Sequence, residues 1–200
     1  MKGKTMIKRF LIPVTFLIAL FLALLFLPGP APATETGTLT FRIVNKLTGS
    51  GTLSAGADTL NYNKEWKLTD GTGALKAESV FHDSRTLTAS ANEELDLSGT
   101  LTDAFGASIT FTKIKAIAIY AASANTNNVL VGGSLTNAFI NWVSDATDKL
   151  IVQPNGMFFL MNPTSGGYGV TPATGDLLKI ENSGAGTSVT YEIIIIGETT

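Results

Sequence analysis

The chain has 200 residues, of which 44% are hydrophobic and 15% are charged, and its formal net charge at pH 7 is −2. It contains no Cys and a single His, His82. These counts exclude thiol catalysis, disulfide bonds, Cys-based zinc sites and any site built on two His ligands of one chain, while the length allows one well-filled core.

The first predicted element is an apolar leader. Four basic residues precede an apolar run over residues 10–27: Lys2, Lys4, Lys8 and Arg9. Small residues at Ala31 and Ala33 complete the pattern of a secretory signal peptide. The run is also just long enough for an uncleaved membrane anchor, and an upstream choice of start codon is a further explanation. We predict a signal peptide or anchor, as a hydrophobic helix, over residues 1–33 and an exported domain over residues 34–200.

The predicted domain is acidic. Residues 34–200 hold ten Lys and Arg against sixteen Asp and Glu, a net charge of −6, and they contain no basic run. Such a surface offers no electrostatic footprint for nucleic acid or for anionic lipid. We expect no nucleic-acid partner, and membrane contact only through the leader if it is uncleaved.

Short strands separated by turns are predicted for the first half of the domain. Residues 38–44 alternate apolar and polar side chains, which predicts a strand with one face in water. Residues 61–68 place Tyr62 and Trp66 at even positions, which predicts an edge strand. Between them, residues 46–57 are rich in Gly, Ser and Thr and are predicted to form a loop. Further predicted elements are a turn at residues 70–73, an ambiguous segment at 79–83 and strand segments at 85–91 and 94–97.

A central strand is predicted within residues 95–120. Residues 109–112 alternate apolar and polar side chains, and residues 116–120 are apolar at every position. An apolar run on both faces is typical of a strand that is covered on both sides. We expect this strand to have its main partners in residues 149–161 and 188–196.

The second half contains the one predicted helix of the domain. Four residues stand near helical spacing within residues 135–143: Leu135, Ala138, Phe139 and Trp142. This spacing predicts a short helix. Residues 149–152 and 157–161 are predicted to form a hairpin around the turn at residues 154–156, where Pro presets φ and Gly closes the turn. Further predicted elements are strands at residues 129–131, 176–181 and 188–196, a loop at 165–169 and a turn at 182–186.

Together these elements predict an all-β fold. About eight to ten short strands, with turns roughly every 8 to 12 residues, are typical of an antiparallel β-sandwich. A parallel α/β fold needs helices between its strands, and one short helix does not supply them. We therefore predict a single antiparallel β-sandwich or jelly-roll-like domain.

Residues that could carry catalysis are few. His82, Asp83 and Ser84 are adjacent, so their side chains point apart and do not form a catalytic triad. Glu93 and Glu94 are candidates for one half of a glycosidase pair. Two residues are candidates for the other half: Asp96 and Asp103. Adjacent carboxylates at the start of a strand are more typical of a solvated edge, and we predict no catalytic residue.

Metal and ligand sites are also weakly indicated. Four oxygen-bearing side chains occur close together, without the order of a calcium-binding loop: Asp58, Asn61, Asn63 and Glu65. Four aromatic residues are candidates for stacking on a sugar: Tyr62, Trp66, Trp142 and Tyr168. Trp142 is expected in the core beside Phe139. We predict no metal and no cofactor, and we keep Trp66 and Tyr168 as candidate ligand contacts.

An ordered series of motifs begins at Arg85. Its segments are RTLTASANEELDLSGTLTDAFG, SITFTKIKAIAIY, VGG at residues 131–133, ATDKLIVQPNGMFFLMNP, GYGV, TGDLLKIENSGAG and TSVTYEIIIIG. In order and spacing this series resembles a family of small structural proteins of tailed bacteriophages and prophages. The resemblance implies a non-enzymatic β-sandwich component of the virion, associated with the capsid or the tail. Its partners would be proteins in a repeated assembly, including other copies of the chain.

The leader departs from that family, because virion proteins assembled in the cytoplasm need no export. The alternative prediction is therefore an exported binding module of a bacterium, located in the periplasm, on the cell surface or outside the cell. Carbohydrate is the expected ligand class in that case, with Trp66 or Tyr168 as its contact.

Overall fold

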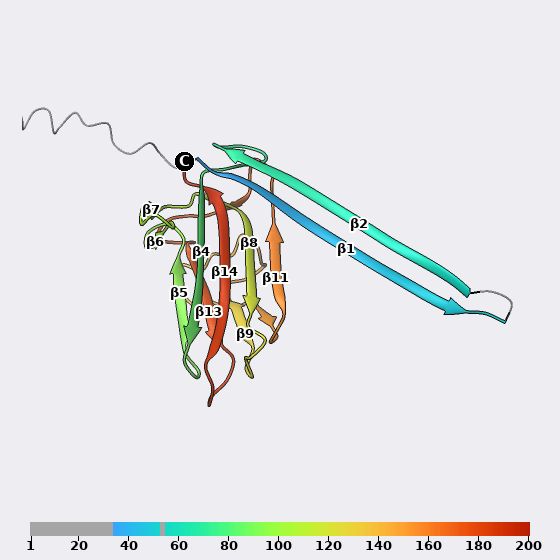
Figure 1. Ribbon diagram of the computed structural model, residues 1–200. Coiled ribbons are helices and arrows are strands. Elements are labelled where there is room, and N and C mark those ends of the chain that lie inside the picture. The colour runs from blue at the N-terminus through green and yellow to red at the C-terminus, as the bar shows by residue number, and fades with distance from the viewer. Residues whose placement is uncertain (1–33, 53–54) are drawn as a thin grey trace, which may run out of the picture. The chain divides into compact units, whose positions relative to one another are not determined.

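The computed structural model describes residues 34–52 and 55–200, so the leader predicted over residues 1–33, with its hydrophobic helix, lies outside the described residues (Figure 1). The described part is built from fourteen strands. This part contains no helix, and therefore none of the length and apolarity that a membrane span requires. The predicted all-β class with antiparallel sheets is confirmed.

Two antiparallel sheets form a β-sandwich-like body (Figure 1). The first has the strand order β10-β9-β13-β5, and the second has the order β11-β8-β14-β4 with β12 paired to β8. The first sheet contains β5 (Asn92–Asp96), β9 (Val129–Gly132), β10 (Lys149–Val152) and β13 (Leu177–Asn182). The second contains β4 (Ser79–Leu87), β8 (Lys113–Ala121), β11 (Met157–Met161), β12 (Tyr168–Gly169) and β14 (Val189–Glu198). A small separate pair joins β6 (Leu101–Thr102) and β7 (Ser108–Ile109).

The main core lies between these two sheets. Side chains alternate between the faces of a strand, so every second residue of each sheet faces inward. The inward residues meet in one buried cluster, which includes Ile117, Ile119, Ile193 and Ile195 from the second sheet and Val131, Leu178 and Ile180 from the first. The central strand predicted within residues 95–120 is β8, and it lies between β11 and β14 as expected.

A β-bulge interrupts β8 at Lys115. Gly197 of β14 lies opposite Ile114, whereas the residue before Gly197 lies opposite Ala116. Lys115 is therefore the extra residue, and the bulge shifts the alternation of the strand by one position. As a result Ile114 and Ile117 both face the main core, although a regular strand would place them on opposite faces.

The prediction of a short helix over residues 135–143 is wrong. This segment runs as a loop beside β13, where Ala138 forms a parallel bridge with Leu177 and the Phe139 N–H donates to the Leu177 carbonyl at 3.0 Å. The backbone groups of Asn137 and Phe139 thus bond to a neighbouring segment of the chain, and only one local turn follows, where the Val143 N–H donates to the Ile140 carbonyl at 2.9 Å. Phe139 is nevertheless buried in the main core, and Trp142 packs against that core, as predicted.

The prediction of a hairpin over residues 149–161 is also wrong, because the two strands do not pair with each other, although the predicted turn between them is present. β10 pairs with β9 in the first sheet and β11 pairs with β8 in the second, so the chain crosses between sheets here. The Gly156 N–H closes the turn by donating to the Gln153 carbonyl at 2.8 Å. Pro154 followed by Asn155 at φ 64° fits a type II turn. Turn chemistry alone does not determine whether the strands on either side pair with each other.

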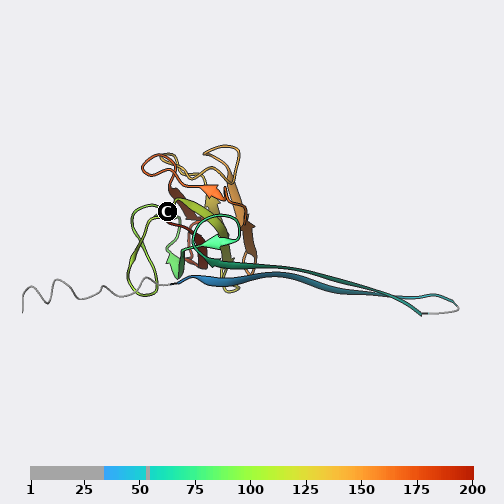
Figure 2. The ribbon, with the colours of Figure 1, turned by 90° about the horizontal axis from the view of Figure 1, so that it is seen from above.

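A long hairpin precedes the body. β1 (Thr36–Ser50) and β2 (Ala55–Asp70) pair antiparallel over fifteen positions, and they run side by side in both views (Figures 1 and 2). At about 3.3 Å per residue, the paired ribbon is roughly 50 Å long. At the base of the hairpin, β3 (Lys76–Ala77) forms a short parallel pair with the end of β2.

This hairpin corrects one prediction and confirms two. The loop predicted over residues 46–57 is wrong, because most of this stretch belongs to β1 and β2. Its Gly, Ser and Thr residues pair across the ribbon, for example Gly49 with Gly56, and backbone pairing of this kind is independent of side-chain composition. The strands predicted at residues 38–44 and 61–68 are confirmed, and they lie opposite each other.

Candidate functional site

The hairpin has one apolar face and one polar face. Residues directly opposite each other in an antiparallel pair share a face, and successive residues alternate between faces. Eight apolar side chains therefore share one face, which we call the apolar hairpin face: Leu39, Phe41, Ile43 and Leu47 on β1 and Leu60, Tyr62, Trp66 and Leu68 on β2. Three polar residues lie on the same face: Asn45, Asp58 and Lys64. The other face carries mostly Thr, Asn and charged side chains.

Burial changes along the apolar hairpin face. Leu68 is 2% exposed, and Leu39 and Trp66 near the base are half-buried. Farther from the base the side chains are exposed: Phe41 (45%), Ile43 (40%), Leu47 (72%), Leu60 (50%) and Tyr62 (43%). A lone two-stranded ribbon is at best marginally stable in water, and a contiguous exposed apolar surface marks an interaction site. The far part of this face therefore has the character of a contact surface.

The base of the apolar hairpin face packs on the outward face of the second sheet. Leu68 and Ala77 form a buried cluster with residues of this sheet, and Leu39 packs against the cluster. The sheet residues of the cluster form one row across four strands, which we call the covered row: Val80 on β4, Ile196 on β14, Ala116 on β8 and Met161 on β11. The apolar hairpin face and this sheet face are thus complementary within one chain.

The next row of the same sheet face is not covered. Residues two positions along each strand point to the same side. The register places four of them in a line, which we call the bare row: His82 on β4, Ile194 on β14, Ala118 on β8 and Phe159 on β11. Ile194 is 45% exposed and Phe159 is 40% exposed. The apolar character of the sheet face therefore continues beyond the part that the hairpin base protects.

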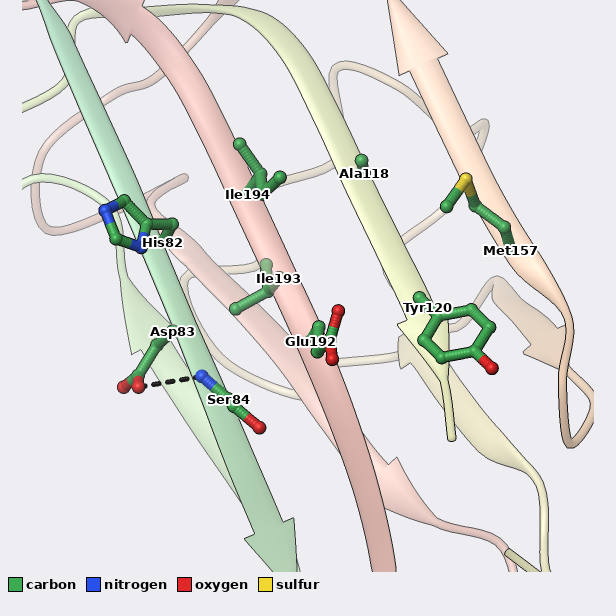
Figure 3. Close-up of a pocket in the computed structure, with 9 residues that line it drawn as sticks. All are labelled: His82, Asp83, Ser84, Ala118, Tyr120, Met157, Glu192, Ile193 and Ile194. Carbon is green, nitrogen blue, oxygen red and sulfur yellow. Dashed lines mark hydrogen bonds between the residues drawn. The ribbon is translucent and has the colours of Figure 1, made fainter. Parts of the chain in front are cut away.

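A shallow groove of about 560 Å³ opens over the bare row. Figure 3 shows Ile194 and Ala118 on neighbouring strands, with Met157 beyond them on β11. The small Ala118 side chain leaves the hollow between its larger neighbours. Two acidic side chains also line the groove, and both are exposed: Asp83 and Glu192.

A buried ion pair fixes the hairpin base to the body. The Lys115 Nζ lies 2.9 Å from the Glu198 Oε1, and both side chains are fully buried. Lys115 also donates to the carbonyls of Gly73 and Thr164, and Lys113 forms a second ion pair with Glu198 at 2.8 Å. The Gly73 N–H donates to Glu198 at 2.6 Å. Because Gly73 lies between β2 and β3, this network ties the exit of the hairpin to β8 and β14.

The same network sets the ionisation of Glu198. Burial raises the pKa of this carboxyl, but the hydrogen bonds from Lys113, Lys115 and the Gly73 N–H outweigh burial, so the pKa lies below its ordinary value. Sequence reasoning missed the network. Its one signal is Lys115, which stands between apolar residues of the predicted central strand, since a fully buried Lys requires a charged partner. The partner lies far along the chain, where no local pattern identifies it.

The carboxylates considered for glycosidase chemistry bind structural partners. Glu93 accepts hydrogen bonds from Arg85 and from the Tyr191 hydroxyl, the latter at 2.7 Å, and so links β5 to the second sheet. Burial, followed by the hydrogen bond to Glu93, raises the pKa of Tyr191. Glu94 accepts a hydrogen bond from the Ser134 hydroxyl at 2.7 Å.

The two candidates for the other half of the glycosidase pair bind backbone N–H groups close by in sequence. Asp96 accepts a hydrogen bond from the Ser98 N–H at 3.0 Å, and Asp103 accepts one from the Phe105 N–H at 2.8 Å.

The two candidate ligand contacts lie on different elements. Trp66 is half-buried on β2 opposite Leu39. Tyr168 is half-buried on β12, where it packs against the main core, and burial raises its pKa. Neither residue lines the groove over the bare row. Their role as ligand contacts stays a prediction.

The other polar candidates are dispersed on strands. His82, Asp83 and Ser84 lie in the middle of β4, and the Ser84 N–H donates to Asp83 at 2.8 Å (Figure 3). The oxygen-bearing residues considered for calcium lie along β2, where Asp58 is on the apolar hairpin face and the other three are on the polar face. Within residues 34–52 and 55–200, no group of three or more His, Asp or Glu side chains is placed to hold a metal ion.

Comparison with known proteins gives no information about the role of these surfaces. No protein-family model, no curated protein and no solved structure matches the chain. The described residues expose two separate apolar surfaces, the far part of the apolar hairpin face and the bare row. Surfaces of this kind are suited to contact with protein.

Proposed function

We propose that the chain is a non-enzymatic structural protein that works in a repeated protein assembly, and that this assembly is the particle of a tailed bacteriophage or a prophage. One observation carries the proposal: the apolar hairpin face is buried at Leu68 but exposed at Phe41, Ile43 and Tyr62. Removing such apolar surface from water is favourable, and another protein chain provides the cover. The motifs from Arg85 onward, which resemble phage structural proteins, support the choice of a virion.

The body supports this role because it is a well-packed domain to which the hairpin is attached. Its core is filled by the inward faces of two sheets, and the Lys115–Glu198 pair holds the segments where the hairpin leaves the body. A ribbon roughly 50 Å long gives such a protein the reach to contact a neighbouring subunit. We also propose jelly-roll-like connectivity for the body. The hydrophobic helix predicted over residues 1–33 is not required by a virion role and is the feature that favours export.

An exported carbohydrate-binding module is less well supported. Its candidate contacts, Trp66 and Tyr168, are both half-buried against their own chain. Stacking on a sugar requires an open aromatic face, and the open aromatic residues of the hairpin, Phe41 and Tyr62, pack edge to face with ring centroids 6.2 Å apart. These contacts favour an apolar protein surface over a sugar platform.

Mass spectrometry of purified particles tests the proposal. Particles induced from the host strain should contain peptides of residues 34–200 in a fixed ratio to the major capsid protein. A cell-envelope fraction from the same culture is the control. The proposal is overturned if the protein is missing from the particles and is recovered in the envelope with Thr34 as its first residue.

A further inference from the structure

The chain carries two uncovered surfaces whose neighbouring parts already pack on each other. Leu68 and Leu39, at the base of the apolar hairpin face, pack on the covered row of the second sheet. The far part of the same hairpin face continues from this base, and the bare row lies next to the covered row on the same sheet face. Each exposed surface thus extends one side of a contact that the chain itself makes.

The charges of the two parts are complementary. Residues 36–70, which contain the hairpin, hold four basic and three acidic residues, a net charge of +1. Residues 71–200, which contain the body, hold six basic and twelve acidic residues, a net charge of −6. At the surfaces themselves, Asp83 and Glu192 line the groove, whereas the apolar hairpin face carries one charge of each sign, Lys64 and Asp58. Opposite charges of this kind steer association and disfavour the contact of like surfaces.

We propose that the far part of the apolar hairpin face of one copy seats on the bare row of a second copy of this chain. This inference rests on the proposed function and names the partner in the assembly. Ile43 and its neighbours on the hairpin cover Ile194 and Ala118, as Leu68 covers the adjacent row within each chain. The hairpin of the same copy does not fill this role, because its base is fixed over the covered row and its far residues remain exposed.

Cross-linking between single-Cys variants tests the contact without background, because the chain has no Cys. Ile43→Cys in one preparation is mixed with Ile194→Cys in another, both in the full chain, and treated with a short bis-maleimide. We expect a cross-linked dimer that contains one copy of each variant. The matched control replaces Ile43→Cys by Arg42→Cys, which lies next to it in sequence but on the polar face. This control should yield far less mixed dimer.

Two results of this experiment overturn the proposal. Efficient cross-linking of Ile43→Cys to itself, without the mixed dimer, shows that hairpins pair with hairpins. Equal yields with Arg42→Cys show that the contact does not depend on the apolar hairpin face.

Two lysine substitutions test how much the apolar hairpin face contributes to the affinity of self-association. Ile43→Lys places a charge on the apolar hairpin face, whereas Val44→Lys places the same charge on the polar face at a residue that is 58% exposed. Burial of one Ile side chain supports at least about a tenfold change in affinity. Sedimentation velocity should therefore show self-association at least about tenfold weaker for Ile43→Lys and nearly unchanged for Val44→Lys. Equal weakening by both variants, or none by either, contradicts the proposal.

The two proposals fail separately. If the protein is present in particles but the mixed cross-link does not form, the contact with the bare row is wrong while the virion role stands. If the mixed cross-link forms but particles lack the protein, self-association stands and the assembly is not a virion.

Discussion

The hairpin and the body are built from the same alternating pattern and differ in what covers it. In β14 the inward side chains meet the opposite sheet, and Ile193 is 1% exposed. In β1 the equivalent apolar side chains have cover only near the base, and Ile43 is 40% exposed. Alternation shows that a strand has a face to bury, but it does not show whether the partner is in the same chain. In the function that we propose, the body provides stability and the hairpin provides the contact with another chain.

The largest effect that separates the two regions is expected at the buried ion pair. Lys115→Met leaves the Glu198 carboxylate buried without its fully buried lysine partner, so that of the two lysines only Lys113 remains. Breaking such a pair costs about 3–5 kcal/mol in the free energy of unfolding. The control is Lys67→Met on the hairpin, where the pair with Glu65 is exposed and worth less than about 1 kcal/mol. Urea unfolding measures both values, and a loss below about 1 kcal/mol for Lys115→Met would contradict the anchoring role.

A matched pair of Ile substitutions gives the next largest difference. Ile193→Ala removes a side chain from the main core and should lower the free energy of unfolding by about 2–5 kcal/mol. Ile43→Ala removes an exposed side chain and should change it by less than about 1 kcal/mol in dilute protein. Urea unfolding of both variants at one low protein concentration makes the comparison. Similar losses at the two positions would show that the hairpin is part of the cooperative core.

A smaller effect is expected from pH. The pKa of Glu198 in the folded protein lies below its ordinary value of 4.5, so the stability that this carboxylate contributes is present above that value. It is lost as the pH falls through the folded pKa. The free energy of unfolding, measured from pH 7 to pH 3, should therefore fall less steeply in Glu198→Gln than in the unchanged protein. Glu78 and Glu181 also have lowered pKa values, so some slope remains in the variant. Identical slopes would contradict this role of Glu198.

The parts of the fold that the sequence predicts are those with a local signal. Alternation over residues 38–44 and the apolar run at 116–120 predicted strands that the structure contains. The sequence predicts the Pro154 turn correctly but predicts the wrong partners for the strands on either side of it, because pairing depends on two sheets that assemble from distant segments. The spacing at residues 135–143 predicts a helix, but this segment forms a loop because its backbone bonds to β13 instead.

The candidate site was less accessible to sequence reasoning than the fold. The sequence pattern identifies Tyr62 and Trp66 as one face of a strand, but Leu47 on the facing strand lies within residues 46–57, whose Gly, Ser and Thr content is typical of a loop. The bare row draws its four residues from four strands, so no local pattern connects Ile194 with Ala118. The bulge at Lys115 has a similar origin, because a one-residue shift in register leaves little trace in composition.

Hydrogen exchange at two protein concentrations tests most directly whether the hairpin depends on a second copy. Backbone amides of β8 and β14 should be protected at both concentrations, because their cover lies within the chain. Amides of residues 41–47 and 58–64 should be protected at high concentration and exchange rapidly on dilution or in Ile43→Lys. Equal protection of these hairpin amides at both concentrations, in a protein that sediments as a monomer, would contradict the account.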